Sequence, residues 1–209
     1  TFSGVLASAL AMDKYRMSEL MRAHDIVAPR GILVTARTPI RKILPQVRFP
    51  GVVKPNCLGS SIGITVNITN AKDFQKALKL AFRYDREVLV EEYIHGREIT
   101  ASVLGNDHPR ALPLIEIVSK IGNFYNYESK YAKGGSEHII PAPLSPALFK
   151  KIQEIAQKIH VLIDARGVSR SDFILRGSTP YFLEVNTIPG MTKTSLVPPS
   201  AEKAGLTFG

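Results

Sequence analysis

Two short β-rich segments near the end of the chain constrain its fold more than any other feature. Residues 169–175 and 181–186 alternate between apolar and polar side chains, and the turn-rich residues 176–180 join them. This pattern predicts an antiparallel pair of strands. Because side chains alternate between the faces of a strand, we expect Phe173 and Leu183 to serve the core face of the pair.

The register of this pair determines which polar side chains meet on its other face. We predict that Leu175 pairs with Tyr181, because both flank the turn. The polar face then holds two directly opposed pairs, Asp172 with Glu184 and Arg170 with Asn186.

Two carboxylates that face each other across a ladder repel, so Asp172 and Glu184 need a reason to be there. A solvated polar face is the simplest alternative for an arbitrary hairpin. A divalent cation would reverse the sign of the interaction, and magnesium typically takes one or two carboxylates together with substrate phosphates. Asn186 adds a neutral oxygen ligand. The hairpin therefore favours a metal–phosphate site.

The rest of the chain alternates between helical and strand patterns, which predicts an α+β protein with two lobes and a boundary near residues 91–96. Helices are expected at residues 3–23, 39–47, 71–84 and 145–163, and strands at 31–35, 51–55, 64–68, 87–94, 98–104 and 111–118. Residues 122–143 have little periodicity. A loop of that length inside a compact chain is usually functional.

Composition limits the class of partner. The 209 residues carry a formal net charge of +9, but the basic residues are spread along the chain without a dense run. This favours a solvated basic surface or a small polyanionic ligand, and we expect neither nucleic acid nor membrane as a partner. The single cysteine, Cys57, suits a reducing compartment, so the cytoplasm is expected.

The glycine-bearing loop at residues 54–63 offers small residues whose backbone N–H groups could hold an anion. It is not a P-loop, because no Lys-Ser/Thr pair follows the glycines. Residues 59–63 also fit the G-x-S-x-G nucleophile elbow of hydrolases, but an elbow requires a helix next. A strand pattern follows instead, so we expect a phosphate-covering hairpin.

Several segments together resemble the D-alanine–D-alanine ligase family, in the family's order and over nearly the whole chain. They are ALAMDK (9–14), VKP (53–55), GSSIG (59–63), VEEYI (90–94), GREIT (96–100), FYNYESKY (124–131), GVSRSD (167–172), LEVNTIPGMT (183–192) and SLVP (195–198).

This resemblance implies an α+β ATP-grasp fold whose two lobes close on ATP. The central lobe would span residues 1–92 and the C-terminal lobe residues 93–209, with a lid loop at 122–143. It also implies magnesium, as two ions for which manganese can substitute.

The resemblance further assigns roles to individual residues. ATP would contact Lys14, Lys54, Ser61, Glu91 at the adenine end and Glu98 at the ribose. The metal ligands would be Asp172, Glu184 and Asn186. Ser60 and Tyr131 would position substrate and close the site, and Lys130 would lie near the γ-phosphate. Arg170 would stabilise the negative charge of the tetrahedral intermediate. The second amino acid would occupy a pocket formed by Arg170, Gly190, Ser195 and Leu196.

The implied reaction is ATP-dependent joining of two D-alanines through an acyl phosphate, for peptidoglycan precursors. Family members carry an N-terminal lobe ahead of the segment that begins here, so we expect this chain to lack the first-substrate residues and to be doubtful as a catalyst alone. A homodimer is implied for the full-length protein. A D-alanyl-D-serine or D-alanyl-D-lactate ligase, and a non-catalytic ATP-binding fragment, remain alternatives.

Overall fold

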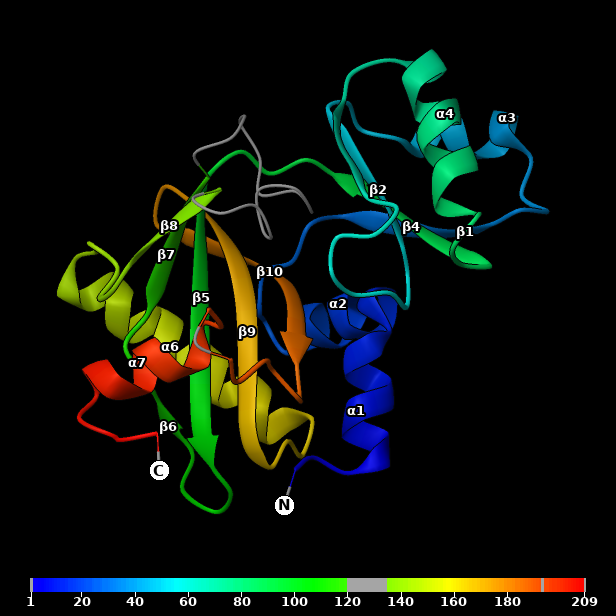
Figure 1. Ribbon diagram of the computed structural model, residues 1–209. Helices are drawn as coiled ribbons and strands as arrows, with labels where there is room; N and C mark the ends of the chain where they lie inside the picture. Colours follow the sequence, from blue (N-terminus) through cyan, green and yellow to red (C-terminus); the bar gives the residue numbers. More distant parts are fainter. Residues whose placement is uncertain (1, 120–134, 193, 209) are drawn as a thin grey trace.

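The computed structural model describes residues 2–119, 135–192 and 194–208 and contains two antiparallel sheets in separate lobes (Figure 1). The smaller sheet has the strand order β1-β4-β2-β3. Its strands are β1 (Gly31–Thr35), β2 (Gly51–Pro55), β3 (Thr65–Ile68) and β4 (Glu87–Glu92). They match the predicted segments closely.

Helices cover one side of this smaller sheet (Figure 1). The main one is α4 (Ala71–Ala81), which begins where the Asn70 side chain accepts a hydrogen bond from the backbone N–H of Asp73. Its buried face, including Phe74 and Leu78, packs against Val53 and Val90. The predicted helix at 39–47 is shorter, because α3 (Ile40–Ile43) passes into a 3₁₀ turn at Leu44–Gln46 that contains a proline.

The larger sheet has six strands, in the order β10-β9-β5-β7-β8 with β6 paired to β5. The strands are β5 (Arg97–Gly105), β6 (Arg110–Ala111), β7 (Ile115–Ser119), β8 (Ser136–Ile139), β9 (Gly167–Arg176) and β10 (Thr179–Asn186). Helix α6 (Pro146–Leu162) packs on one face, and the short α7 (Val197–Lys203) lies near the C-terminus. The sheet thus places β9 and β10 beside the smaller lobe.

The single helix expected at residues 3–23 is wrong, because the chain forms two helices that meet at Asp13. They are α1 (Val5–Met12) and α2 (Lys14–Ala23). Asp13 has extended backbone angles, φ −88° and ψ 95°, and its side chain accepts from the backbone N–H of Arg16. An aspartate at an N-cap position begins a new helix by satisfying an otherwise unpaired donor.

Both N-terminal helices share a core with the larger sheet. Met17 and Met21 of α2 are fully buried in one cluster with Ile99, Phe173 and Phe182. This packing associates the first two helices with the larger lobe, although they precede the smaller sheet in sequence. The lobe boundary at residues 92 and 93 stays a proposal.

Part of the segment expected to be a lid loop, residues 122–143, is a regular strand. Ser136–Ile139 forms β8, which pairs with β7 in the register Glu116 with Ile139. Residues 120–134 lie outside the described residues. Among those that are described, no helix combines the length and the hydrophobicity that crossing a membrane requires.

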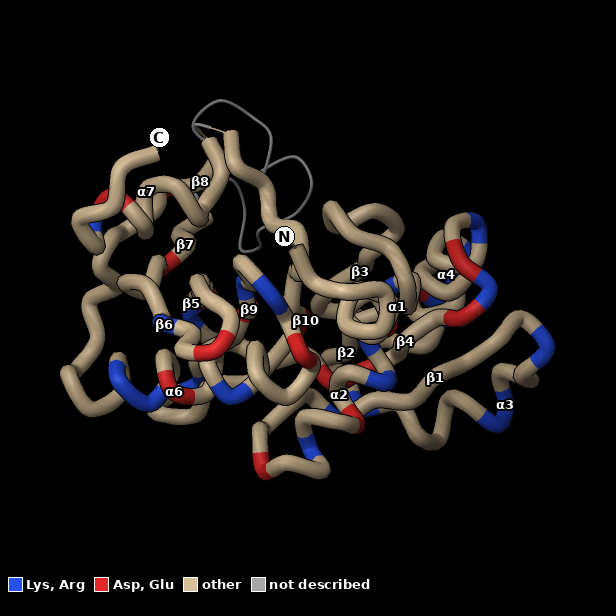
Figure 2. Tube along the Cα trace, turned by 90° about the horizontal axis from the view of Figure 1, so that it is seen from below, with Lys and Arg blue, Asp and Glu red and all other residues tan. Residues whose placement is uncertain are grey.

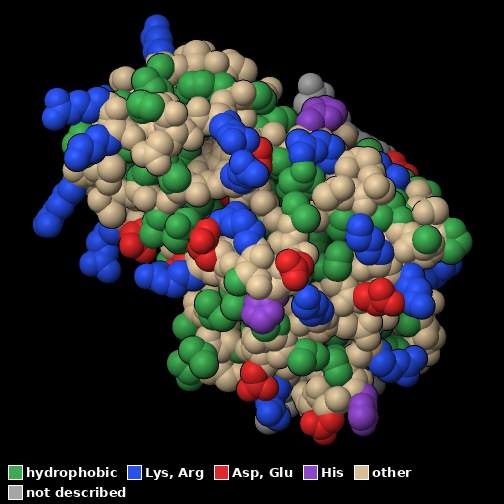
Figure 3. Space-filling view, turned by 180° about the vertical axis from the view of Figure 1, so that it is seen from behind, with side chains coloured by type: hydrophobic (Ala, Val, Ile, Leu, Met, Phe, Trp, Pro, Cys, Tyr) green, Lys and Arg blue, Asp and Glu red, His purple; other side chains and the backbone are tan. Residues whose placement is uncertain are grey.

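Lysines and arginines lie along the helices and loops of the smaller lobe (Figure 2), and on one face several basic side chains project outward from the molecule (Figure 3). The exposed ones on and beside its helices are Arg37, Arg41, Lys42, Arg48, Lys72, Lys76, Lys79, Arg83 and Arg86. None of them is among the residues that line the cleft described below.

Candidate functional site

A cleft between the two sheets collects most of the predicted nucleotide and metal residues. Of the predicted set, it is lined by Lys14, Lys54, Ser61, Glu91, Glu98, Asp172 and Glu184. Apolar side chains complete the walls: Val52, Ile64, Val66, Ile94, Ile174 and Leu183. An apolar pocket with a few convergent charged groups is the usual form of a small-molecule site.

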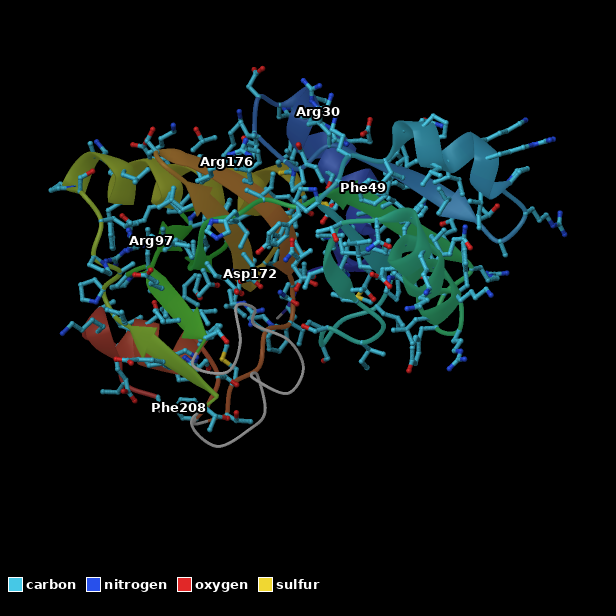
Figure 4. All side chains as sticks on the ribbon, turned by 90° about the horizontal axis from the view of Figure 1, so that it is seen from above. Arg30, Phe49, Arg97, Asp172, Arg176 and Phe208 are labelled. Carbon is cyan, nitrogen blue, oxygen red and sulfur yellow. The ribbon has the colours of Figure 1, made fainter. Side chains whose placement is uncertain are left out.

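Two adjacent rungs of the larger sheet carry the polar face predicted from the hairpin. Asp172 lies opposite Glu184, and Arg170 lies opposite Asn186. Asp172 lies on the part of the larger lobe that faces the smaller one (Figure 4). The two predicted pairs are therefore confirmed.

The route to this register was predicted wrongly. Leu175 pairs with Pro180 rather than Tyr181, and the register shifts between Phe182 and Glu184. Leu183 is the extra residue of this bulge, and a bulge re-aims side chains locally. As a result, Leu183 lines the cleft together with Glu184, instead of serving the core face.

The carboxylate of Asp172 is almost fully buried and is held by two residues. Arg170 donates from Nε to Oδ1 at 3.0 Å and from Nη2 to Oδ2 at 2.8 Å. The hydroxyl of Thr100 donates to Oδ1 at 2.5 Å. Such charge-assisted, bidentate contacts fix the orientation of a carboxylate as well as its charge.

Two lysines bring positive charge into the cleft. Lys14 lies 3.5 Å from the carboxylate of Glu184 and donates to the backbone oxygen of Leu58 at 2.5 Å. Lys54 donates to Glu91 at 2.5 Å, and both of these side chains are buried. The cleft therefore holds ammonium groups whose charges are partly compensated by its own carboxylates.

The glycine-bearing loop joins β2 to β3, as expected for a hairpin, so the hydrolase elbow is excluded by its context. Ser60 and Ser61 have positive φ angles of 56° and 58°, and Ser61 lines the cleft. Gly63 has φ +71°, and a Cβ there would lie 2.7 Å from the ring of Tyr84. This loop thus covers one side of the cleft in a conformation that favours small residues.

Of the four residues assigned to the second substrate, Gly190 and Ser195 lie side by side, Arg170 is paired with Asp172, and none of the four lines the cleft. A Cβ on Gly190 would meet the Ser195 hydroxyl oxygen at 2.7 Å, and that oxygen accepts from the backbone N–H of Thr192 at 3.1 Å. Leu196 is buried in a small cluster with Ile115 and Ile117. Lys130 and Tyr131, assigned to the lid, lie outside the described residues.

Thr100 was missed by the sequence analysis, although a signal for it exists. Counting two residues on from Glu98 along the predicted strand places Thr100 on the same face. Its register partner is Asp172. Glu92 was missed as well; its carboxylate accepts from the backbone N–H of Arg30 at 2.9 Å and so fixes the start of β1. No sequence pattern marked that contact.

The environment of Cys57 argues against chemistry at its thiol. Burial raises the pKa of Cys57, and the nearby carboxylates of Asp13 and Asp85 raise it further. A thiol needs a lowered pKa to act as a nucleophile at neutral pH. Tyr93, which lines the cleft, likewise has a pKa raised by burial and stays protonated.

The donor set fits magnesium better than a transition metal. Within the described ranges, no group of three or more His, Cys, Asp or Glu side chains could hold a metal alone. Asp172 and Glu184 instead supply two hard oxygen ligands side by side, and the remaining positions would fall to phosphate oxygens. Asn186 would contribute its amide oxygen, whereas its buried Nδ2 has no hydrogen-bond partner among the described residues.

Comparison with known proteins identifies the family. Residues 26–209 match the family model described as D-ala D-ala ligase C-terminus. The D-alanine–D-alanine ligase of Desulforamulus reducens is 46% identical over 100% of this chain and 69% of its own length. That of Carboxydothermus hydrogenoformans is 44% identical, with the same coverage.

Solved structures agree in fold. The VanG D-Ala:D-Ser ligase of Enterococcus faecalis superposes with a TM-score of 0.86 at 34% identity, covering 99% of this chain and 61% of that one. The D-alanine–D-alanine ligase of Bacillus anthracis complexed with ATP gives 0.82 at 30% identity, covering 100% and 66%. With its two sheets enclosing a charged cleft, the chain has the ATP-grasp fold and belongs to the D-alanine–D-alanine ligase family.

Proposed function

We propose that this chain provides the ATP site and the acceptor site of an ADP-forming ligase that joins two D-alanines for peptidoglycan precursors. The observation that carries the proposal is the interlobe cleft. Its two lysines, its adjacent carboxylates and its apolar walls suit a nucleotide whose base is buried and whose phosphates meet charge.

In this proposal the two ends of the cleft bind different parts of ATP. Glu91 and Lys54 form the buried polar group at the adenine end, and Glu98 accepts hydrogen bonds from the ribose hydroxyls. Lys54 extends from its contact with Glu91 toward the phosphates, and Lys14 offers a second positive charge to them. Lys14 is linked to the loop of Ser61 through the backbone oxygen of Leu58. The solved ATP complex of the Bacillus anthracis relative supports ATP as the nucleotide.

Magnesium would be held by Asp172, Glu184 and Asn186, with manganese as a substitute and with room for a second ion among the phosphates. When bound, the cation neutralises charge on the phosphate oxygens. In its absence Lys14 and Arg170 offset the two carboxylates, which otherwise repel each other across the ladder.

The chain's own residues would then support two chemical steps. A carboxylate oxygen of the first D-alanine bonds to the γ-phosphorus, and the bond to ADP breaks. The amine of the second D-alanine next attacks the acyl carbon, loses a proton and expels phosphate. Arg170 would hold the oxyanion of the tetrahedral intermediate formed by this attack, and Lys130 would offset charge on the γ-phosphate. Ser60 and Tyr131 would close the site and keep water away from the acyl phosphate.

D-alanine is the proposed acceptor, with Gly190, Ser195 and Leu196 shaping its pocket. Curated relatives at 42–46% identity carry the D-alanine–D-alanine ligase name, and this supports the choice. The D-Ala:D-Ser ligase among the structural relatives makes D-serine the acceptor to test against it. We also propose a cytoplasmic location, where ATP is available, and a homodimer for the full natural protein.

The test uses the full natural protein that contains this sequence, because the chain spans 69% of the length of the first curated relatives. The protein is incubated with ATP, magnesium and D-alanine, alone or with D-serine or D-lactate. Mass spectrometry should detect D-alanyl-D-alanine and ADP in equal amounts. Release of ADP without dipeptide, or a mixed product formed in preference, would contradict the proposed acceptor.

A further inference from the structure

A buried threonine on β5 contacts one of the proposed metal ligands but is not itself a proposed ligand. Thr100 is 1% exposed, and its hydroxyl donates to Oδ1 of Asp172 at 2.5 Å. A threonine hydroxyl has one hydrogen to donate. Its second acceptor among the described residues, the backbone oxygen of Ser171, is 3.5 Å away, so the hydrogen is directed to the carboxylate.

The strand register explains why this contact is fixed by the fold. Thr100 pairs with Asp172 across β5 and β9, and Asp172 pairs with Glu184 across β9 and β10. One rung of three neighbouring strands therefore carries hydroxyl, carboxylate and carboxylate in a row. Thr100 approaches Asp172 from the side opposite to Glu184, which leaves the side between the two carboxylates open to a cation.

Arg170 contacts the same carboxylate, but it cannot replace Thr100. Its guanidinium bonds both oxygens of Asp172 and, in the proposed reaction, is needed at the oxyanion. Coordination of a cation by Asp172 competes with this bidentate contact for the oxygen lone pairs. The Thr100 bond uses one position on Oδ1 and can persist when the arginine contacts are exchanged.

We propose that Thr100 is a positioning residue that keeps the Asp172 carboxylate directed toward Glu184 while its partner changes from Arg170 to the metal ion. Outer partners of metal-ligating carboxylates orient the ligand, and their loss typically lowers metal affinity by about 10–100-fold. The inference rests on the proposed function, because it assumes the magnesium site.

The chain contains a matched control on the same strand and the same face. Ser102 is two residues along β5, is 2% exposed and pairs with Arg170 in the register. Its hydroxyl has no hydrogen-bond partner among the described residues. Removing it therefore deletes a buried hydroxyl of the same strand without touching the Asp172 carboxylate.

The experiment measures Mn²⁺ affinity by the EPR signal of free Mn²⁺, in the presence of a non-hydrolysable ATP analogue and without turnover. Thr100→Val should raise the Mn²⁺ Kd by about tenfold or more. Thr100→Ser and Ser102→Ala should stay within about twofold of the unchanged protein, since both leave a hydroxyl on Asp172. Thr100→Ala replaces the valine variant if the latter does not fold.

The possible results distinguish a failure of the positioning role of Thr100 from a failure of the proposed metal site. An unchanged Mn²⁺ Kd in both the valine and alanine variants overturns the positioning role, as does an equal loss in Ser102→Ala. Failure of the unchanged protein to bind Mn²⁺ with the analogue would instead reject the proposed metal site. A melting temperature that falls in Thr100→Val while its Mn²⁺ Kd is unchanged would assign Thr100 a purely structural role.

Discussion

Glu184 faces Asp172 directly across β10 and β9, one residue after the bulge formed by Leu183. The bulge lets Phe182 keep its place in the core while Leu183 and Glu184 both turn toward the cleft. The two carboxylates are each accompanied by a cation, Arg170 for Asp172 and Lys14 for Glu184. The hairpin thus places the apolar side chain of Leu183 and the charged side chain of Glu184 in the cleft from consecutive positions.

Replacing Glu184 with glutamine removes one of the two opposed carboxylates and should weaken magnesium-dependent nucleotide binding by about tenfold or more, equivalent to about 1.4 kcal/mol. Isothermal titration with ATP, with and without magnesium, measures the effect. The difference between the two titrations should shrink in the variant, whereas magnesium-free binding should change little. Equal losses with and without magnesium would count against the metal site.

Leu183→Ala should weaken ATP binding while leaving the Mn²⁺ Kd unchanged, since the side chain lines the cleft but carries no ligand atom. Truncating a contacting leucine removes about 1–2 kcal/mol of apolar burial, which is roughly a tenfold change in Kd. The control is Ile188→Ala on the segment after β10, because Ile188 is 65% exposed. A loss of Mn²⁺ affinity in Leu183→Ala would mean that the bulge itself had been disturbed.

The buried pair of Lys54 and Glu91 should behave as a unit in stability measurements. Glu91→Gln leaves a buried ammonium without its carboxylate, and breaking such a pair costs about 3–5 kcal/mol. Chemical denaturation should show this loss. The double variant Lys54→Met with Glu91→Leu should recover most of the free energy of unfolding while failing to bind ATP. Additive losses in the double variant would show that the two residues act independently.

The free energy of unfolding should fall as the pH drops below about 6.5, the ordinary pKa of histidine. Burial lowers the pKa of His160, whose ring nitrogens face the Ser169 hydroxyl and the Gly105 carbonyl. Because the folded pKa is depressed, the unfolded chain binds the proton first as the pH falls, and the folded state loses stability. Burial also lowers the pKa of His138, so His138 should contribute to the same loss of stability at low pH.

Urea denaturation at pH 7.5 and pH 5.5 checks this, with His160→Gln as the variant and His95→Gln, at an exposed position, as the control. His160→Gln should reduce the difference in unfolding free energy between the two pH values, and His95→Gln should preserve it. An unaltered pH dependence in His160→Gln would place its origin elsewhere.

Much of this architecture could be predicted from local patterns. The strands of the smaller sheet and the helix at 146–162 follow directly from hydrophobic periodicity, and Ser145 caps that helix as its sequence suggests. The opposition of Asp172 and Glu184 was also predictable. The prediction nevertheless gave Leu175 the wrong partner, because an alternating pattern of apolar and polar residues does not show where a bulge inserts an extra residue.

Other features depend on contacts between distant segments, which one sequence does not reveal. Asp13 interrupts what reads as one helix, because its carboxylate serves Arg16 and Asn56 instead of solvent. Helical spacing on both sides of it gave no sign of the break. Strand β8 was missed because its edge position beside β7 tolerates the polar residues Ser136, Glu137 and His138.

The same interruption at Asp13 has a mechanical consequence. Asn56, which follows β2 of the smaller lobe, accepts from the backbone N–H groups of Lys14 and Tyr15, and its amide donates to Asp13 at 3.0 Å. Helix α2 packs in the core of the larger lobe, so these hydrogen bonds tie the two lobes together at Asn56, beside the chain connections at residues 24–30 and 93–96. Asn56 is fully buried. Any widening of the cleft must therefore either keep these hydrogen bonds or leave buried polar groups without partners, which costs free energy.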